Sequence, residues 1–229
     1  MSGSPKLYLD WCSAKAASYA CTRWHYSGVL PAFKTAKVGV WEADEYRGCI
    51  VFTNPMPPAR KRFKCSNGQI TELARVALRS HYHPVSKMIR IALRILKKEN
   101  PGLKVCVSYA DSGQGHHGGI YQAAGFRYFG AGKGTKEYFY KGRWVHARSI
   151  GQAIDTGKLT EDGWNLPNRP SGLKHCYALT LDKRGSYSIP LEDKPYPKRR
   201  VLSDTSDTKA SQALKTGATP SSTLQKGRA

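Results

Sequence analysis

The strongest signal in the sequence is a long amphipathic helix, Pro84–Glu99, with a strand-like run on each side of it. Within this stretch apolar residues recur at helical spacing, and Asn100-Pro101-Gly102 follows as a stop. The flanking runs, Gln69–Leu78 and Val105–Ala110, are apolar and typical of strands. A chain that alternates in this way is expected to fold into packed layers of helix and sheet.

The remaining elements extend the same pattern. Two strand-like runs, Lys37–Glu42 and Tyr46–Phe52, are joined by a tight acidic turn and predict a hairpin. We further expect a helix over Trp11–Trp24, a short helix over Ile120–Ala124, a strand at Phe126–Phe129 and a second hairpin in EYFYKGRWVHA. The predicted fold class is α+β, with a mixed central sheet flanked by helices.

Composition divides the chain into three parts. We expect a main domain in residues 1–150 and a C-terminal extension in residues 151–200 that packs on it and contains a strand-like pair, HCYALTL and SYSIPL. Residues 201–229 contain no aromatic residue and are rich in Ser, Thr, Lys, Ala and Gly. That composition predicts a disordered basic tail.

The chain is strongly basic. Its 37 Lys and Arg residues outnumber 16 Asp and Glu residues, which gives a net charge of +21. Only five of these net charges belong to Tyr196–Ala229, so the body of the protein carries most of the surplus. A surplus of this size favours a polyanionic partner, with nucleic acid ahead of an anionic membrane.

The cysteines and the first residues bear on location. The six cysteines show no C-x-x-C spacing and are interpreted as buried thiols of a reducing compartment. The opening MSGSPKLYLDW has no apolar signal-peptide segment, and no stretch approaches the length of a transmembrane helix. We therefore expect a soluble, cytoplasmic protein without a signal peptide.

One junction is unusually rich in glycine. The stretch YADSGQGHHGGIYQAAGF, Tyr109–Phe126, places five glycines and two adjacent histidines between a strand and a short helix. An ordinary connection needs few residues and about one glycine. The junction is therefore either a slack surface loop or a place where something approaches the backbone closely.

These motifs carry a family resemblance. The unit formed by ELARVAL, PVSKMIRIALRILKKENPG, VCVSYAD and GGIYQAAGFRYFG resembles the GNAT acetyltransferase superfamily. More closely, Lys6–Arg200 is similar to the Mom family of phage DNA modification proteins, through RWHYSGVLP, ELARVALRSHYHPVSKMIRIAL, YADSGQGHHGGIYQAAGF and KPYPKR. The resemblance implies a GNAT-like catalytic domain in residues 1–150. It also implies a transferase that converts adenine in phage DNA to N6-carbamoylmethyladenine and so protects the DNA from host restriction enzymes.

The resemblance also implies partners. These are double-stranded DNA in a host cell and a donor of two carbons, which is acetyl-CoA, a related small molecule or an aminoacyl carrier; iron is a further candidate cofactor, and no membrane is expected. Two rival functions stay open. One is a conventional acetyl-CoA-dependent N-acetyltransferase acting on RNA or a small amine, and the other is a basic DNA-binding protein without catalysis.

Four residues are catalytic candidates. Asp111 ends a strand and is expected to accept a proton from the exocyclic amine of adenine, although an Asp before Ser and Gly also caps turns. Tyr121 stands where the superfamily often places a tyrosine that protonates the departing thiolate; the alternative is a packed aromatic. His25 is a candidate base or metal ligand, or a helix-ending residue, and Tyr26 could stack on an extruded base.

The donor site departs from the superfamily pattern. In that superfamily a glycine loop before the long helix holds the pyrophosphate of CoA on its N–H groups. The corresponding stretch here, Arg79–Met88, contains no glycine. The candidates for binding the donor are therefore basic or polar residues near the helix start, together with two glycines of the junction: Arg79, Ser86, Lys87, Gly113 and Gly115.

Histidines and basic residues complete the set. Four histidines, 81, 83, 116 and 117, could join Asp111 in an iron site or could each be solvated. The expected DNA phosphate contacts are Arg60, Lys61, Arg62, Lys64, Arg199 and Arg200, with Arg143, Arg148, Lys174, Lys183, Arg184 and Lys198 as further candidates. Chemistry on N6 requires the base to leave the stack, and the aromatic residues expected to receive it are Trp24, Tyr26, Phe33 and Tyr82.

Overall fold

The structure is a computed structural model that describes residues 3–32, 34–132, 134–182 and 185–198. Residues 1–197 form one compact unit. The predicted tail, 201–229, lies outside the described residues, as do the predicted DNA contacts Lys183, Arg184, Arg199 and Arg200 and the aromatic candidate Phe33.

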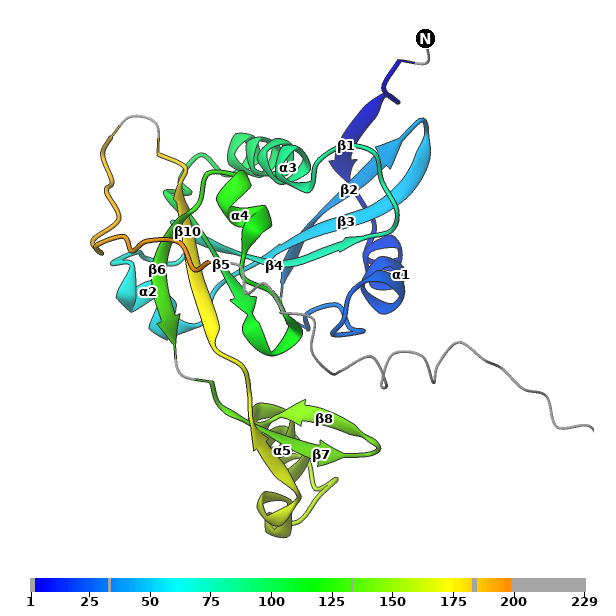
Figure 1. Ribbon diagram of the computed structural model, residues 1–229, viewed down its shortest axis with the longest axis vertical. Helices are drawn as coiled ribbons and strands as arrows, with labels where there is room; N and C mark the ends of the chain where they lie inside the picture. The colour runs from blue at the N-terminus through cyan, green and yellow to red at the C-terminus, as the bar shows by residue number, and fades with distance from the viewer. Residues whose placement is uncertain (1–2, 33, 133, 183–184, 199–229) are drawn as a thin grey trace, which may run out of the picture. The chain divides into compact units, whose positions relative to one another are not determined.

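A seven-stranded sheet forms the centre of this unit (Figure 1). In spatial order its strands are β1 (Leu7–Trp11), β2 (Thr35–Glu42), β3 (Glu45–Thr53), β4 (Ile70–Leu78), β5 (Val105–Asp111), β10 (Lys174–Thr180) and β6 (Arg127–Gly132). Strands β4 and β5 pair in parallel, and the other neighbouring pairs are antiparallel. The predicted α+β class with a mixed central sheet is confirmed.

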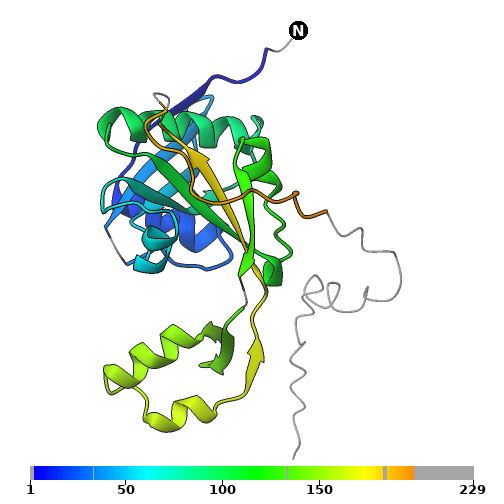
Figure 2. The ribbon, with the colours of Figure 1, turned by 90° about the vertical axis from the view of Figure 1, so that its left-hand side faces the viewer.

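Side-chain alternation along β3 separates the two faces of the sheet. Ile50 and Phe52 pack in one core with α3 (Val85–Glu99), whereas Cys49 and Val51 pack in another with α1 (Ala14–Trp24). Because neighbouring residues of a strand point to opposite faces, these two helices cover opposite sides. Figure 2 shows α3 lying along one face of the seven-stranded sheet. The short helices are α2 (Pro57–Arg62), α4 (Gly119–Ala123), η1 (Ser112–Gln114) and η2 (Glu161–Asn165).

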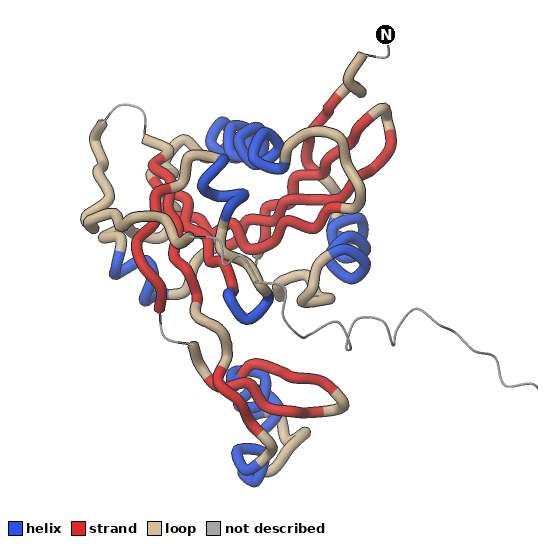
Figure 3. The backbone as a smooth tube through the Cα atoms, viewed as in Figure 1, coloured by secondary structure: helices blue, strands red, loops and turns tan. Residues whose placement is uncertain are grey.

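A smaller sheet is built from the order β8 (Arg143–His146), β7 (Lys136–Tyr140) and β9 (Asn168–Pro170). Helix α5 (Ala147–Asp155) packs against β7 and β8 (Figure 3). The Tyr138 side chain of β7 and Ile150 of α5 are both buried. One face of this sheet is therefore covered by its own helix.

Three elements differ from expectation. Trp11 belongs to the edge strand β1, and α1 begins only at Ala14, after the Ser13 hydroxyl caps it by accepting the Ala16 N–H at 3.1 Å. Helix α2 lies within the proline-rich run NPMPPARKRFK, for which no helix was predicted, and has proline at its first two positions. SYSIPL is not a strand.

The alternation in SYSIPL has another cause. Tyr187, Ile189 and Leu191 pack against the core cluster that contains Phe63, and the Tyr187 hydroxyl donates to the Phe63 carbonyl at 2.7 Å. The apolar residues are thus spaced for packing on the sheet rather than for pairing with it. Across the described residues, the structure contains no helix with both the length and the apolar character needed to cross a membrane.

Candidate active site

Strands β4 and β5 separate part-way along their length. They are paired only from Ile70 and Val105 to Glu72 and Val107, although both strands continue well beyond. The Ser108 hydroxyl donates to the Leu73 carbonyl at 2.8 Å where the ladder ends. Beyond this point the facing backbone groups no longer pair with each other, which opens a place for a ligand between the strands.

We call the place where β4 and β5 separate the fork. A pocket of about 410 Å³ lies next to it and is lined by Ala110 and by residues 115–121. Its volume suits a small-molecule ligand. Tyr26, in the loop after α1, meets the pocket residue His116 edge-on, with ring centroids 5.4 Å apart. The end of β5, the glycine-rich junction and the loop after α1 therefore meet here, and they bring Tyr26 and Tyr121 to one region.

Asp111 stands at the end of β5 and is almost fully buried. Its carboxylate accepts the Gly113 N–H at 3.0 Å and forms an ion pair with the ammonium of Lys174, which lies directly opposite in the register of β10. The turn-capping role is therefore present, beside the ion pair with Lys174. The negative charge of Asp111 reaches Tyr26, where it adds to the effect of burial in raising the pKa of that phenol.

His25 is held in one tautomer. The Ser27 N–H donates to His25 Nδ1 at 3.1 Å, and the Ser27 hydroxyl lies 2.8 Å from the same nitrogen. A backbone donor requires Nδ1 to be the acceptor, so the proton of the neutral ring sits on Nε2. Burial, with the positive charges of Arg75 and His116, lowers the pKa of His25 to about 4. At neutral pH His25 thus offers an N–H donor rather than a free basic nitrogen.

The Tyr121 phenol is also kept neutral. Burial raises its pKa to about 12, against an opposing hydrogen bond with Ser108. Its ring contacts those of Phe126 and Tyr177 at centroid distances of 5.7 and 5.5 Å. The packed-aromatic role is therefore present, and at neutral pH the hydroxyl can donate a proton but not supply a phenolate.

Two charged residues of β4 join this region without having been predicted. The guanidinium of Arg75 lowers the pKa of His25 and forms no ion pair within the described residues, while its Nε is buried without a hydrogen-bond partner. Burial raises the pKa of Glu72, which Arg75 and Arg148 partly oppose. Two charges inside the apolar run ITELARVAL were the signal for them.

The glycines of the junction are accounted for largely by contacts within the protein. A Cβ on Gly118 would lie 2.3 Å from the Tyr177 ring, whose hydroxyl donates to the His117 carbonyl at 2.5 Å. A Cβ on Gly113 would lie 3.0 Å from the Gly172 nitrogen. What approaches this backbone at both positions is the chain around β10.

A pair of substitutions tests this account. Gly118→Ala should destabilise the protein by more than about 2 kcal/mol, because the methyl group meets Tyr177 and the residue has a left-handed φ of 83°. Gly115→Ala has a similar φ of 72° but no atom within 4 Å, so about 1 kcal/mol is expected. Urea unfolding of both variants measures the difference, and equal losses would contradict the role given to Tyr177.

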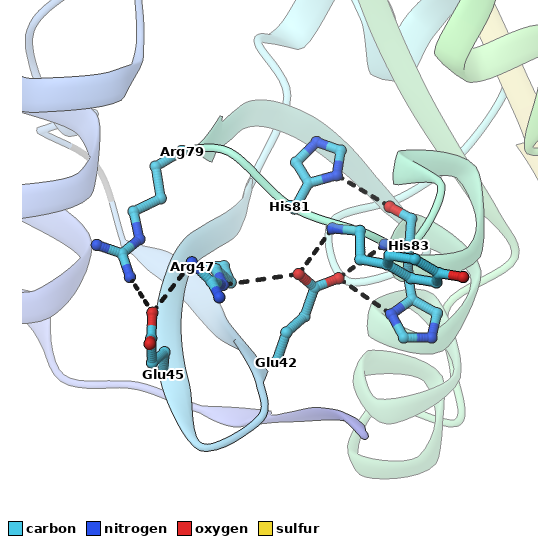
Figure 4. A network of polar contacts seen from close by, with 7 residues as sticks. Glu42, Glu45, Arg47, Arg79, His81 and His83 are labelled. Carbon is cyan, nitrogen blue, oxygen red and sulfur yellow. Dashed lines mark hydrogen bonds and ion pairs between the residues drawn. The ribbon is translucent and has the colours of Figure 1, made fainter. Parts of the chain in front are cut away.

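The loop before α3 is organised by a buried carboxylate (Figure 4). Glu42, only 1% exposed, accepts the N–H groups of Tyr82 and His83 at 2.8 Å each, and the His83 ring Nδ1 lies 3.0 Å from the same carboxylate. At the other end of the network Arg79 donates to Glu45 at 2.6 Å, and Arg47 lies between the two carboxylates. His83 is buried and His81 is exposed, so the two do not share one environment.

This loop does not fit a pyrophosphate bound in the manner of a glycine loop. Two of its N–H groups are already taken by Glu42, Pro84 has none, and a buried negative charge would repel the ligand. Ser86 and Lys87 remain at the start of α3, with Ser86 half-buried and Lys87 exposed. Neither they nor Arg79 line the 410 Å³ pocket.

No metal centre is visible in the part of the chain that the structure describes. No three His, Cys, Asp or Glu side chains there are placed to share an ion. The expected iron site therefore finds no support among these residues.

The predicted basic run lies on and just after α2. Arg60, Lys61 and Lys64 line an open groove of about 690 Å³. Arg62 instead donates to the Phe129 carbonyl at 2.8 Å, which ties the end of α2 to β6. Three of the four described candidates are thus available to an anion in one place.

Fold and pocket together define an α+β protein with a ligand-sized pocket where two parallel strands separate. The chain belongs to the Mom protein family, whose family model matches residues 6–198. No curated protein matches it. Among solved structures, an acetyltransferase of Bacillus subtilis in complex with CoA is 14% identical with a TM-score of 0.46, covering 77% of this chain and 100% of that one. A candidate acetyltransferase of Acinetobacter baylyi ADP1 is 13% identical with a TM-score of 0.45, covering 80% and 96%.

Proposed function

We propose that this protein is a transferase that converts adenine in DNA to N6-carbamoylmethyladenine and thereby protects phage DNA from restriction. Membership of the Mom family across the described unit is the observation that carries the proposal. The net charge of +21 and the basic groove on α2 support a DNA substrate.

The residues around the fork have roles that suit this reaction. Transfer of the donor unit to N6 requires N6 to lose a proton, and the Asp111 carboxylate is the group proposed to accept it. Neutral Tyr121 is the proposed proton donor to the leaving group, and Tyr26 the surface against which the extruded base stacks. Arg75 can hold an anionic part of the donor without competition from an ion pair in the described residues.

The donor is constrained by the loop before α3. Because that loop does not fit a pyrophosphate, we assign no step to CoA. A glycyl unit on an aminoacyl carrier supplies the two carbons and the one nitrogen of the product. Its nitrogen is bonded to the methylene carbon, so acyl transfer to N6, which releases the carrier alcohol, gives N6-glycyladenine, and a rearrangement of this isomer must follow to give the carbamoylmethyl group.

Mass spectrometry of nucleosides tests the function. DNA from cells that express the protein is expected to contain adenosine heavier by C₂H₃NO. The same increment would arise from N6-glycyladenine, an isomer with an amide at N6, so fragmentation must show N6 bonded to a methylene group. Unmodified adenine in cells that contain folded protein would refute the proposal.

A further inference from the structure

The small sheet presents an uncovered aromatic face. Phe139 and Trp144 stand opposite each other on β7 and β8, with ring centroids 5.4 Å apart, and they are 42% and 39% exposed. Arg169 of β9 lies over the Trp144 ring, 4.4 Å from its centroid. The opposite face, which carries Tyr138, is the one that α5 covers.

Within residues 3–198, apart from the four positions that the structure does not describe, no packing contact explains why these rings face solvent. Tyr138, their neighbour in sequence, is 6% exposed and meets Trp164 at 5.6 Å, so the small sheet has a core on its other side. Large exposed apolar surfaces on a folded protein usually mark an interaction site. We call Phe139, Trp144 and Arg169 the aromatic face.

The charges around the aromatic face are sorted by sign. Exposed cations occupy the hairpin and the start of α5: Lys136, Lys141, Arg143 and Arg148. The only acid of β7 and β8 is Glu137, which is paired with Arg169 at 3.0 Å. The remaining acids of the region, Asp155, Glu161 and Asp162, lie at the end of α5 and in η2. This arrangement is complementary to a polyanion rather than to a neutral protein surface.

We propose that the aromatic face stacks on an unpaired DNA base next to the modified adenine. Aromatic rings and arginine planes on an exposed sheet are the common means of holding unstacked bases, whereas a closed duplex hides the faces of its bases. This inference rests on the proposed function, because extrusion of the target adenine opens the stack and leaves an unpaired base at the same step of the duplex.

The chain places this face within reach of the candidate active site. Arg169 precedes Lys174 by five residues, and Lys174 pairs with Asp111. Five residues span at most about 17 Å, which corresponds to roughly five base steps along one strand of DNA. A base bound on the aromatic face is thus a near neighbour of a base in the pocket.

DNA binding by the full-length protein tests the inference, with fluorescence anisotropy on two labelled duplexes. One is fully paired, and the other is the same duplex with one unpaired adenine. The wild type should prefer the second, and Trp144→Ala should weaken that binding by about fivefold or more while changing the paired duplex little. Trp144→Phe should retain most of the preference. Trp11→Ala, a tryptophan with a similar exposure of 41% on β1, is the matched control and should change neither.

The outcomes separate clearly. Equal weakening on both duplexes, or none on either, would overturn the inference; the second result would point to a protein partner instead. Phe139→Thr, which keeps a strand-forming residue, provides an independent variant if Trp144→Ala disturbs the small sheet. If the preference for the duplex with an unpaired adenine depends on Trp144 but cellular adenine is unmodified, the proposed function fails, and the inference that the aromatic face binds an unpaired base is retained. If adenine is modified but the pattern is absent, only this inference fails.

Discussion

Asp111→Asn should abolish DNA modification, with the yield of modified adenosine falling at least about 100-fold. The amide has nearly the shape of the carboxylate and can still accept the Gly113 N–H, so the turn after β5 should persist. What the substitution removes is the basic oxygen and the negative charge that pairs with Lys174. Nucleoside mass spectrometry of DNA from cells that express equal amounts of each protein measures the effect.

A control isolates the chemical role from the structural one. Asp155→Asn removes the same charge from an exposed position at the end of α5 and should leave modification unchanged. If Asp111 only caps the turn, Asp111→Asn would cost about 1 kcal/mol of stability and still modify DNA at the wild-type level. That result would remove Asp111 from the mechanism.

The local elements could be predicted because short-range patterns determine them. Helix α3 was expected at Pro84–Glu99 and is observed at Val85–Glu99, since both its apolar period and its stop signal lie within the segment. The first hairpin was predicted for the same reason, and its turn residues Ala43 and Asp44 both adopt positive φ, as a type I′ turn requires. Strand β1 was missed because only Leu9 of its five residues is buried.

Long-range pairing was not predictable. HCYALTL was identified as a strand, but nothing in it indicates that β10 lies between β5 and β6, where Lys174 faces Asp111. That placement pairs the Asp111 carboxylate with Lys174. It also brings Gly172 and Tyr177 so close to Gly113 and Gly118 that these two positions require glycine. A pairing between residues so far apart in sequence depends on the packing of the whole sheet.

The candidate site was predicted only where residues stand at the ends of elements. Asp111 and Tyr121 flank a conspicuous junction, and Tyr26 follows a helix. Arg75 and Glu72 lie inside β4, where charged residues usually mark the solvent side of a half-buried strand. The sequence does not indicate that β4 separates from β5 beyond Glu72, nor that the charge of Arg75 acts on His25.

Glu42→Ala should be the most destabilising of the single charge removals in the network of Figure 4. The carboxylate is 1% exposed, and its loss leaves the N–H groups of Tyr82 and His83 without their acceptor. We expect a loss of about 3 kcal/mol, which lowers Tm by roughly 6–12 °C. Glu45→Ala is the matched control: Glu45 pairs with Arg47 and Arg79 in the same network but is 61% exposed, so its loss should cost no more than about 1 kcal/mol.

The pH dependence of this contribution has a definite sign. Burial alone would raise the pKa of Glu42, but the hydrogen bonds from the His83 and Tyr82 N–H groups and from the His83 ring outweigh it, so the pKa is lowered from 4.5. A carboxylate with a lowered folded-state pKa stabilises the protein above its unfolded-state value and loses that contribution as pH falls through the folded-state value. The stability gap between wild type and Glu42→Gln should therefore be constant above about pH 5.5 and shrink below pH 4.5. A gap that grows on acidification would contradict the lowered pKa of Glu42.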